Sequence, residues 1–287
     1  MSLEDNSRRD DPSTKSRELS WPTTGTVYLT LDLECDFGTA LTKNTYEALD
    51  HVDEVVSLLE GTDIPLTCFV QTEVLDERPE VGERLRSCGA TVEFHPHSHT
   101  HSTREATSIA NEIGHSTRRY REFFGRDPVG YRFPNGNVRP SDYRHLSTHG
   151  YRFDASVFPT WRPGHFDKRD APTVPTYMSQ FDILELPFTV ASSRLPIPTG
   201  LSYCRLFGRP LTYILTRDSR RNIVFNFHLH DLVTPETVSD LSPLYRAIYR
   251  RNDHGLSLLR DMLDAFQDAG FDFDTLGNAH TALRETL

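Results

Sequence analysis

The stretch VYLTLDL, residues 27–33, decides the fold of this chain of 287 residues. It is rich in apolar and β-branched residues, and such a continuous run is typical of a strand that is buried on both faces of a parallel sheet. From this strand onward, short apolar runs alternate with helical patterns. This alternation predicts β-α units joined into a parallel sheet that helices cover.

The order of the predicted elements extends this pattern over most of the chain. Strands are predicted at residues 27–33, 65–70, 91–95, 129–133, 183–187, 223–228 and 271–274. Helices are predicted at residues 45–59, 79–88, 105–124, 140–149, 256–269 and 275–286, with Gly89, Gly125 and Gly150 ending the second, third and fourth of them. We therefore expect an α/β fold, a distorted (β/α) barrel of about seven strands related to the TIM barrel. The chemistry of such barrels lies at the carboxyl ends of the strands.

Two segments fall outside this alternation. Residues 1–22 are charged and polar, and we expect them to be a disordered tail before a catalytic domain of residues 23–287. Residues 157–180 contain four prolines and are expected to form a long surface excursion. The N-terminus lacks the apolar core of a signal peptide, and no apolar run approaches the ~20 residues of a membrane span. These observations favour a cytoplasmic protein.

The composition restricts the partners of the protein. The formal net charge of −10 argues against nucleic acid or anionic lipid as a partner. Only three of the 31 residues counted as Lys or Arg are lysines, so 28 are arginines, and with the excess of acid this suggests a salt-loving organism. The four cysteines include no C-x-x-C pair and are expected to be reduced. The oligomeric state does not follow from the sequence.

Three acidic residues follow one another at the end of the first strand. Asp32, Glu34 and Asp36 occupy alternate positions, and an extended chain places alternate side chains on one face. Three carboxylates on one face repel each other unless a cation or a base lies nearby. A solvated edge fits poorly beside a buried strand, so we interpret the group as functional.

The third strand ends in a cluster of histidines. His95, His97, His99 and His101 are four of the 13 histidines of the chain and fall within seven residues. Imidazole is the commonest metal ligand, and the i, i+4 pair His97 and His101 can meet on one turn of helix. Two histidines and one carboxylate leave positions open on a metal, which is typical of a catalytic rather than a structural site.

Two further strands end in residues that suit catalysis. The strand at residues 129–133 ends with Arg132, which is expected to pair with a carboxylate at the barrel mouth. The strand at residues 223–228 ends in HLHD, where His228 and His230 lie. A histidine at this place is either a buried core residue or the general acid for a leaving amine.

Taken in this order, the segments resemble the polysaccharide deacetylase family, also called carbohydrate esterase family four. The resemblance runs from about residue 27 to about residue 276. The similar motifs are TLDLECDFG at 30–38, PLTCFV at 65–70, HSHTH at 97–101, GYRFPNG at 130–136, GYRFDASVFPT at 150–160 and FHLHDL at 227–232. HSHTH resembles the His-Ser/Thr-x-x-His metal motif of the family.

The resemblance implies a role for each matching residue. Asp32 matches the catalytic base, and Arg132 matches the arginine that orients this base. His97 and His101 match the two metal-binding histidines. His228 matches the catalytic acid, and His230 is the alternative because other branches of the family read Leu-x-His-Asp.

The third metal ligand departs from the family pattern. The family has an Asp directly after the base, where this chain has Leu33. Glu34 shares the face of Asp32 and is favoured as the replacement, with Asp36 as the competitor. The expected cofactor is a divalent metal, zinc by ligand preference, with cobalt, manganese or nickel as alternatives.

The resemblance implies hydrolysis of an N-acetyl group on an amino sugar of a glycan or glycan precursor, with release of acetate. A nucleotide- or lipid-linked sugar suits the expected cytoplasmic location better than a wall polymer does. Two alternatives stay open at this point: an allantoinase-like hydrolase of a cyclic amide, and a catalytically inactive sugar-binding relative.

Overall fold

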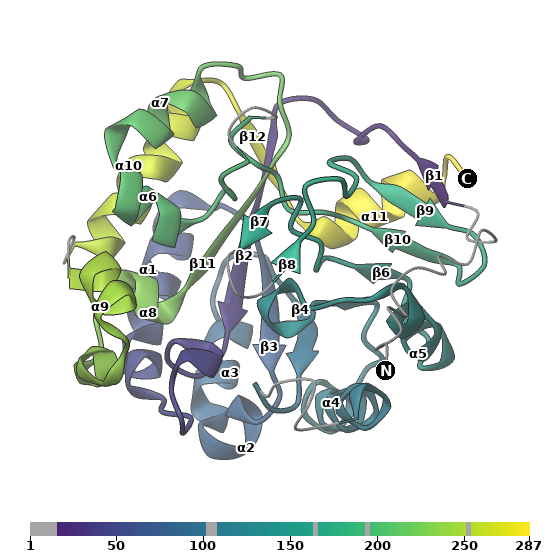
Figure 1. The fold of residues 1–287 in the computed structure, drawn as a ribbon, viewed down its shortest axis with the longest axis horizontal. Helices are drawn as coiled ribbons and strands as arrows, with labels where there is room; N and C mark the ends of the chain where they lie inside the picture. The colour runs from purple at the N-terminus through teal and green to yellow at the C-terminus, as the bar shows by residue number, and fades with distance from the viewer. Residues whose placement is uncertain (1–15, 102–107, 163–165, 193–195, 251–253) are drawn as a thin grey trace, which may run out of the picture.

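The structure, a computed structural model, describes residues 16–101, 108–162, 166–192, 196–250 and 254–287. It has the predicted α/β architecture, in which helices surround an array of mostly parallel strands (Figure 1). The first parallel ladder has the order β11-β2-β3-β4, and β12 pairs with the first part of β2. The bounds of these strands are β2 (Thr26–Leu33), β3 (Leu66–Gln71), β4 (Val92–Ser98), β11 (Ile223–His228) and β12 (Asp272–Asp274).

A second ladder continues the array beyond β4. Its order is β1-β9-β10-β6-β5. The bounds are β1 (Ser16–Glu18), β5 (Gly130–Tyr131), β6 (Phe153–Asp154), β9 (Thr176–Met178) and β10 (Ile183–Glu185). The backbone N–H of Arg132 donates to the carbonyl oxygen of Pro96 at 3.2 Å, which joins the end of β5 to β4. The array thus runs from β11 through β2, β3, β4, β5 and β6 to β10, as expected for a distorted barrel.

The side between β10 and β11 is less regular. There the described residues form two isolated bridges, Val190 with Pro198 and Gly200 with Asn226. Connecting chain therefore replaces part of the strand pairing of a regular barrel on this side.

Strand β2 illustrates how the sequence directs the chain into this array. All eight of its residues are buried. Leu29, Leu31 and Leu33 belong to the main hydrophobic core, whereas Tyr28 belongs to a second core cluster on the other face of the strand. Because successive side chains of a strand alternate between faces, Asp32 lies on the face of Tyr28. The same run therefore supplies two cores and places the buried polar side chains of Thr30 and Asp32 on one face.

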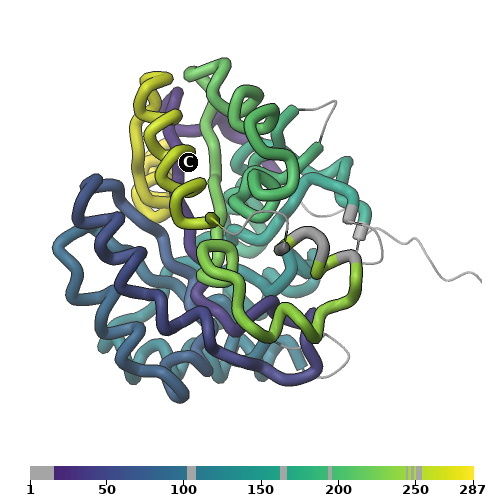
Figure 2. The backbone as a smooth tube through the Cα atoms, turned by 90° about the vertical axis from the view of Figure 1, so that its left-hand side faces the viewer, coloured from purple at the N-terminus to yellow at the C-terminus, as the bar shows by residue number. Residues whose placement is uncertain are grey.

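Helices cover the outside of the array, and Figure 2 shows the side on which α1, α9 and α10 lie. Predicted helices are found as α1 (Val52–Thr62), α3 (Pro79–Arg86), α4 (Ile109–Phe124), α5 (Tyr143–Thr148), α10 (Gly255–Asp268) and α11 (Leu276–Arg284). The sequence pattern did not predict α2 (Val74–Glu77), α6 (Leu201–Phe207), α7 (Arg209–Thr216), α8 (Leu229–Leu232) and α9 (Pro243–Arg250). Short elements complete the fold: η1 (Gly38–Ala40), η2 (Glu47–His51), η3 (Pro134–Gly136), η4 (Pro140–Asp142), η5 (Glu236–Asp240), β7 (Trp161–Arg162) and β8 (Phe166–Asp167).

The expectation of a disordered tail up to residue 22 is wrong for its described part. Strand β1 pairs antiparallel with β9, and the ring of Trp21 stacks on Tyr28 with centroids 5.0 Å apart. Residues 1–15 lie outside the described residues. Contacts with β9 and Tyr28 therefore hold residues 16–21 in place, although this segment is mostly polar.

Two details of the predicted elements also differ. The proline-rich excursion supplies β9, which lies between β1 and β10 in the second ladder. Helix α3 ends with Ser87 as its C-cap, so Gly89 does not cap it. Gly125, with a φ of 67°, is the C-cap of α4 as predicted. Across the described segments, no helix is long and apolar enough to cross a membrane.

A pair of buried carboxyl groups lies side by side on β6 and β10. Asp154 and Glu185 are register partners in the parallel ladder. Glu185 accepts hydrogen bonds from the hydroxyl of Tyr143 and the N–H of Val157, both at 2.9 Å, and Asp154 accepts one from Ser156 at 2.7 Å. Burial and the charge of Glu185 hold the pKa of Asp154 well above its usual value. The pair therefore retains a proton in the folded protein.

We expect Asp154→Asn to lose less stability than the wild-type protein as the pH rises. A carboxyl group whose pKa is raised by folding loses its stabilising contribution between its unfolded pKa, about 4, and its higher folded pKa. The loss is about 1.4 kcal/mol for each pH unit that separates these two pKa values, and an amide cannot ionise. Guanidinium unfolding at about pH 5 and about pH 8 measures the difference in the free energy of unfolding.

The matched control is Asp261→Asn on the exposed face of α10. It should follow the pH dependence of the wild-type protein. An Asp154→Asn variant with the same pH dependence as the wild-type protein would contradict the shared proton.

Candidate active site

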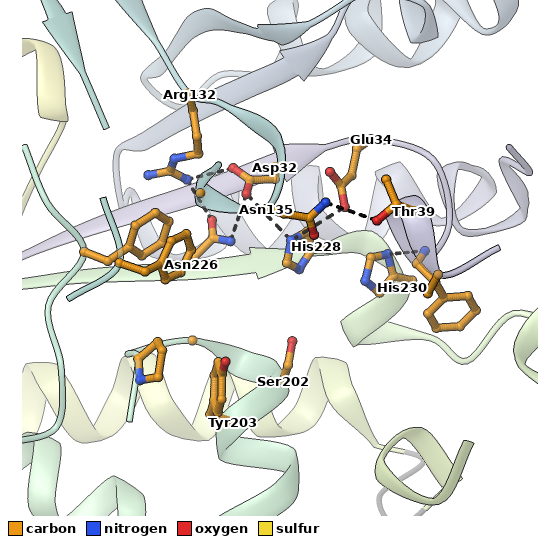
Figure 3. A pocket seen from close by; sticks show the side chains of 18 of the residues that line it. Asp32, Glu34, Thr39, Arg132, Asn135, Ser202, Tyr203, Asn226, His228 and His230 are labelled. Atoms are coloured by element: carbon orange, nitrogen blue, oxygen red, sulfur yellow. Dashed lines mark hydrogen bonds and ion pairs between the residues drawn. The ribbon is translucent and has the colours of Figure 1, made fainter. Parts of the chain in front are cut away.

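The carboxyl ends of β2, β4, β5 and β11 meet at one cavity of about 540 Å³ (Figure 3). The predicted site residues that line it are Asp32, Glu34, His97, His101, Arg132, His228 and His230. Figure 3 shows Arg132, Asp32 and His228 along one side of the cavity, with Ser202 and Tyr203 of α6 facing them. Residues from distant parts of the chain thus converge as barrel topology requires.

Glu34, His97 and His101 form a compact group, which we call the ligand group. Nε2 of His97 lies 3.1 Å and Nε2 of His101 lies 2.8 Å from the same oxygen, Oε2 of Glu34. All three side chains are buried. Burial would raise the pKa of Glu34, but the charge and hydrogen bond of His101 outweigh it and hold this pKa well below its usual value. One atom from each residue lies within 4.8 Å of the others, which suits a single metal ion.

Asp36, the competing third ligand, faces away from the ligand group. Its Oδ2 accepts a hydrogen bond from the hydroxyl of Thr45 at 2.8 Å, and both oxygens accept from backbone N–H groups at the start of η2. The alternation that predicted one acidic face ends because β2 stops at Leu33 and Phe37 adopts a positive φ of 55°. The geometry therefore excludes Asp36 from the ligand group and places Glu34 in it.

The two histidines meet by a different route from the predicted helical turn. His97 lies in strand β4, and the chain changes direction at Ser98, which has a φ of 132°. His101 follows this bend, and the two rings lie 5.7 Å apart. Gly38, with a φ of 53°, lies against His101, because a Cβ at residue 38 would be 2.7 Å from Cε1 of that ring. The prediction of a shared helical turn is therefore wrong, although the pair does converge.

Asp32 is held by a buried polar network. The guanidinium of Arg132 lies between the rings of Phe69 and Phe188, 4.0 and 4.3 Å from their centroids. Its Nη1 donates to Oδ1 of Asp32 at 2.7 Å, and Nδ2 of Asn226 donates to Oδ2 at 3.1 Å. Burial would raise the pKa of Asp32, but the charge of Arg132 outweighs it, and the pKa is lowered. The carboxylate is therefore ionised and oriented, as a general base must be.

His228 points at the carboxylates of Asp32 and Glu34. Its Nε2 lies 3.6 Å from Oδ2 of Asp32 and 3.7 Å from Oε1 of Glu34. Its Nδ1 lies 2.9 Å from Oδ2 of Asp231, whose Oδ1 accepts a hydrogen bond from Ser202 at 2.7 Å. Burial alone would lower the pKa of His228, but its hydrogen bond and charge interaction with Asp231 outweigh it and raise the pKa to about 9. His228 is therefore protonated at neutral pH, as a general acid must be.

His230 has the opposite environment. Its Nδ1 accepts a hydrogen bond from the backbone N–H of Phe37 at 3.2 Å, and its ring stacks on His228 at 4.7 Å. Burial and the charge of His228 lower the pKa of His230 to about 4. A neutral imidazole that accepts at Nδ1 carries its proton on Nε2. Of the two candidate acids, the geometry therefore favours His228.

The proton on Nε2 of His230 argues against a second metal ion at this histidine. Glu34, His228 and His230 also offer ligand atoms within 4.8 Å of one another. However, Nδ1 of His230 is engaged by Phe37, its Nε2 carries the proton, and His228 is protonated. Metal binding needs an imidazole nitrogen with a free lone pair, so this second group suits a metal poorly.

Sequence reasoning misses three residues of this site. Asn226 lies two positions before His228 on β11, and strand alternation could have identified it. Asp231 directly follows the HLH run, but its contact with His228 requires the turn of α8. Ser202 lies on α6, which has no predicted counterpart, so no local signal connects it to the site.

Comparisons with known proteins give a family match over part of the chain and a shared fold over most of it. The polysaccharide deacetylase family model matches residues 22–153, which contain the ligand group, Asp32 and Arg132. No curated protein matches the chain in sequence.

Solved structures share the fold over most of the chain. A protein from Mycobacterium smegmatis named as a polysaccharide deacetylase has a TM-score of 0.62 at 15% identity, with 94% of each chain covered. Puue allantoinase has a TM-score of 0.57 at 14% identity, covering 93% of this chain and 94% of that one. A CE4 family pseudoenzyme from Bacillus anthracis has 0.54 at 12%, covering 90% and 66%. At such identities these likenesses establish the fold alone. Residues 22–153 thus match the polysaccharide deacetylase family, and most of the chain shares its fold with the solved structures named above.

Proposed function

We propose that this protein is a metal-dependent deacetylase that hydrolyses the N-acetyl group of an amino sugar and releases acetate. One observation supports this function best: the ligand group lies in the same cavity as an ionised base, Asp32, and a protonated acid, His228. Amide hydrolysis needs these three parts, because the carbonyl must be activated, the water deprotonated and the amine protonated.

The donor atoms of the ligand group fit a divalent metal, and zinc is the proposed one. Two imidazole nitrogens and one carboxylate oxygen are a typical set for catalytic zinc, and cobalt, manganese or nickel could use the same atoms. Glu34, His97 and His101 would hold the ion. When bound, such a metal acts as a Lewis acid that polarises a carbonyl oxygen and lowers the pKa of water.

The residues of the chain then perform the proton transfers. Asp32 removes a proton from the attacking water, while Arg132 and Asn226 keep its two oxygens in place. His228 donates the proton on Nε2 to the departing amine, which is a poor leaving group without it. Asp231 keeps His228 protonated and fixes the orientation of its ring.

The direct test joins metal analysis of the purified protein to an assay of acetate release over a panel of N-acetyl sugars. Bound metal together with released acetate would support the proposal. Consumption of allantoin without acetate release would favour the allantoinase-like alternative. A protein that binds no metal and hydrolyses nothing after addition of zinc, cobalt or manganese would be an inactive relative.

Replacement of the base should abolish catalysis and spare metal binding. In Asp32→Asn we expect kcat/KM for acetate release to fall by about 10³-fold, because an amide cannot accept the proton. The zinc content should equal that of the wild-type protein, because Asp32 is not in the ligand group. His101→Ala is the contrasting variant and should lose both zinc and activity. Retained hydrolysis in Asp32→Asn would rule out its role as base.

Replacement of the acid should affect amides more than activated esters. In His228→Gln we expect acetate release from an N-acetyl sugar to fall by about 10²- to 10⁴-fold. Hydrolysis of 4-nitrophenyl acetate should change by less than about three-fold, because nitrophenolate leaves without protonation. The control is His115→Gln, an exposed histidine on α4. Equal losses for the amide and the ester would contradict the role of His228 as acid.

A methyl group at residue 38 should lower the affinity for zinc, although residue 38 is not itself in the ligand group. In Gly38→Ala the new Cβ would lie 2.7 Å from the ring of His101, and the backbone would be strained at a φ of 53°. We expect zinc affinity, measured by competition with a chelating dye, to fall by about 10-fold or more. Gly61→Ala is the control, because a Cβ there meets nothing within 4 Å. Unchanged affinity in Gly38→Ala would mean that His101 does not bind the metal in this position.

A further inference from the structure

The cavity has two parts of different chemistry. Its charged and histidine side chains all lie at the strand ends or just beyond them. Many other lining residues are aliphatic or aromatic, and we call six of them the apolar wall: Phe37, Pro198, Tyr203, Leu206, Tyr245 and Tyr249. Figure 3 shows α6, which carries Tyr203, across the cavity from Asp32 and His228. A substrate held at the strand ends therefore has an apolar surface beside it.

The apolar wall is packed and held in place. Phe37 lies edge to face with Tyr249 at 4.8 Å and at 4.9 Å from His230, so the wall abuts the ring that stacks on His228. The buried guanidinium of Arg205 donates to the carbonyl oxygens of Asp231 and Tyr249, both at 2.8 Å. This arginine therefore ties α6, α8 and α9 together around the cavity.

The charges of the cavity argue against a phosphorylated substrate. Among the described lining residues, the only lysine or arginine is Arg132, which is buried and paired with Asp32. A pyrophosphate or phosphodiester group needs cations or several free N–H donors. The formal net charge of −10 adds a repulsive field for such anions. Nucleotide-linked and phospholipid-linked sugars therefore fit this cavity poorly.

Polar groups near the wall are used within the protein. The hydroxyl of Ser202 donates to Asp231 at 2.7 Å, and that of Thr199 donates to the carbonyl oxygen of Val224 at 2.6 Å. Leu206 and Pro198 add aliphatic surface that offers no hydrogen bonds to sugar hydroxyls. The wall thus offers aliphatic and aromatic contact surface to an apolar group.

We infer that the apolar wall is a subsite for an uncharged aryl or alkyl aglycone on the sugar whose N-acetyl group lies at the strand ends. This inference rests on the proposed deacetylase function and specifies its substrate class: a small N-acetylamino glycoside with an apolar aglycone. A compact cavity of about 540 Å³ buries a molecule of that size, as small-molecule pockets do.

The experiment compares acetate release from four probes by the zinc-loaded protein. They are 4-nitrophenyl N-acetyl-β-D-glucosaminide, free N-acetylglucosamine, UDP-N-acetylglucosamine and tetra-N-acetylchitotetraose. We expect kcat/KM for the aryl glycoside to exceed that for each of the others by about 10-fold or more. Equal values, or a preference for the nucleotide sugar or the oligosaccharide, would overturn the inference.

Two neighbouring residues of α6 provide matched variants. Leu206 lines the cavity, whereas Phe207 is 45% exposed and does not. We expect Leu206→Asn to lower kcat/KM for the aryl glycoside by about 10-fold and that for free N-acetylglucosamine by less than about two-fold. Phe207→Asn should leave both values unchanged. Equal losses on both probes in Leu206→Asn would mean that the wall supports the fold and does not bind the aglycone.

A binding measurement separates this inference from the proposed function. The probe is the amine product, 4-nitrophenyl β-D-glucosaminide, titrated calorimetrically into each protein. If it binds and Leu206→Asn weakens it while no probe releases acetate, the subsite stands and the deacetylase proposal fails. If all probes release acetate equally and the product does not bind, the deacetylase stands and the subsite fails.

Discussion

The buried ion pair of Arg132 and Asp32 joins the end of β5 to β2 beside the cavity, and Asn226 adds β11. Two charges inside a barrel are expensive to bury unless they are paired and fully hydrogen-bonded. Here Asn226 bonds to both partners, and aromatic rings lie on either side of the guanidinium. Loss of the arginine would leave a buried carboxylate without its counter-charge, so the fold and the lowered pKa of Asp32 depend on one interaction.

Strand β2 also explains why Glu34, and not residue 33, supplies the carboxylate of the ligand group. Leu33, at the position where the family has its second Asp, is fully buried in the main hydrophobic core. Glu34 is the next residue on the face of Asp32, and its longer side chain reaches both ligand histidines. Strand β2 therefore keeps an uninterrupted apolar face toward the helices and still supplies a carboxylate to the ligand group.

The two histidines after β11 show how environment separates identical side chains. His228 has Asp231 on one nitrogen and faces two carboxylates, whereas His230 receives a backbone N–H and stacks on the cation of His228. The pKa of one is raised to about 9 and that of the other lowered to about 4. Opposite changes in the pKa of neighbouring groups are a common basis for assigning acid and base roles.

The sequence by itself determined the parallel α/β array and the motifs at its strand ends, because alternating and helical periodicities are local properties of the chain. It also singled out His97, His101, Asp32 and Arg132, which the fold brings to one cavity. Only the tertiary structure distinguished Glu34 from Asp36 and His228 from His230. These choices depend on the backbone turn at Phe37 and on partners such as Ser202, which lie far away in the sequence. The apolar wall, to which α6 and α9 contribute Tyr203, Leu206, Tyr245 and Tyr249, likewise exists only after folding, because no local pattern records which helices will cover a cavity.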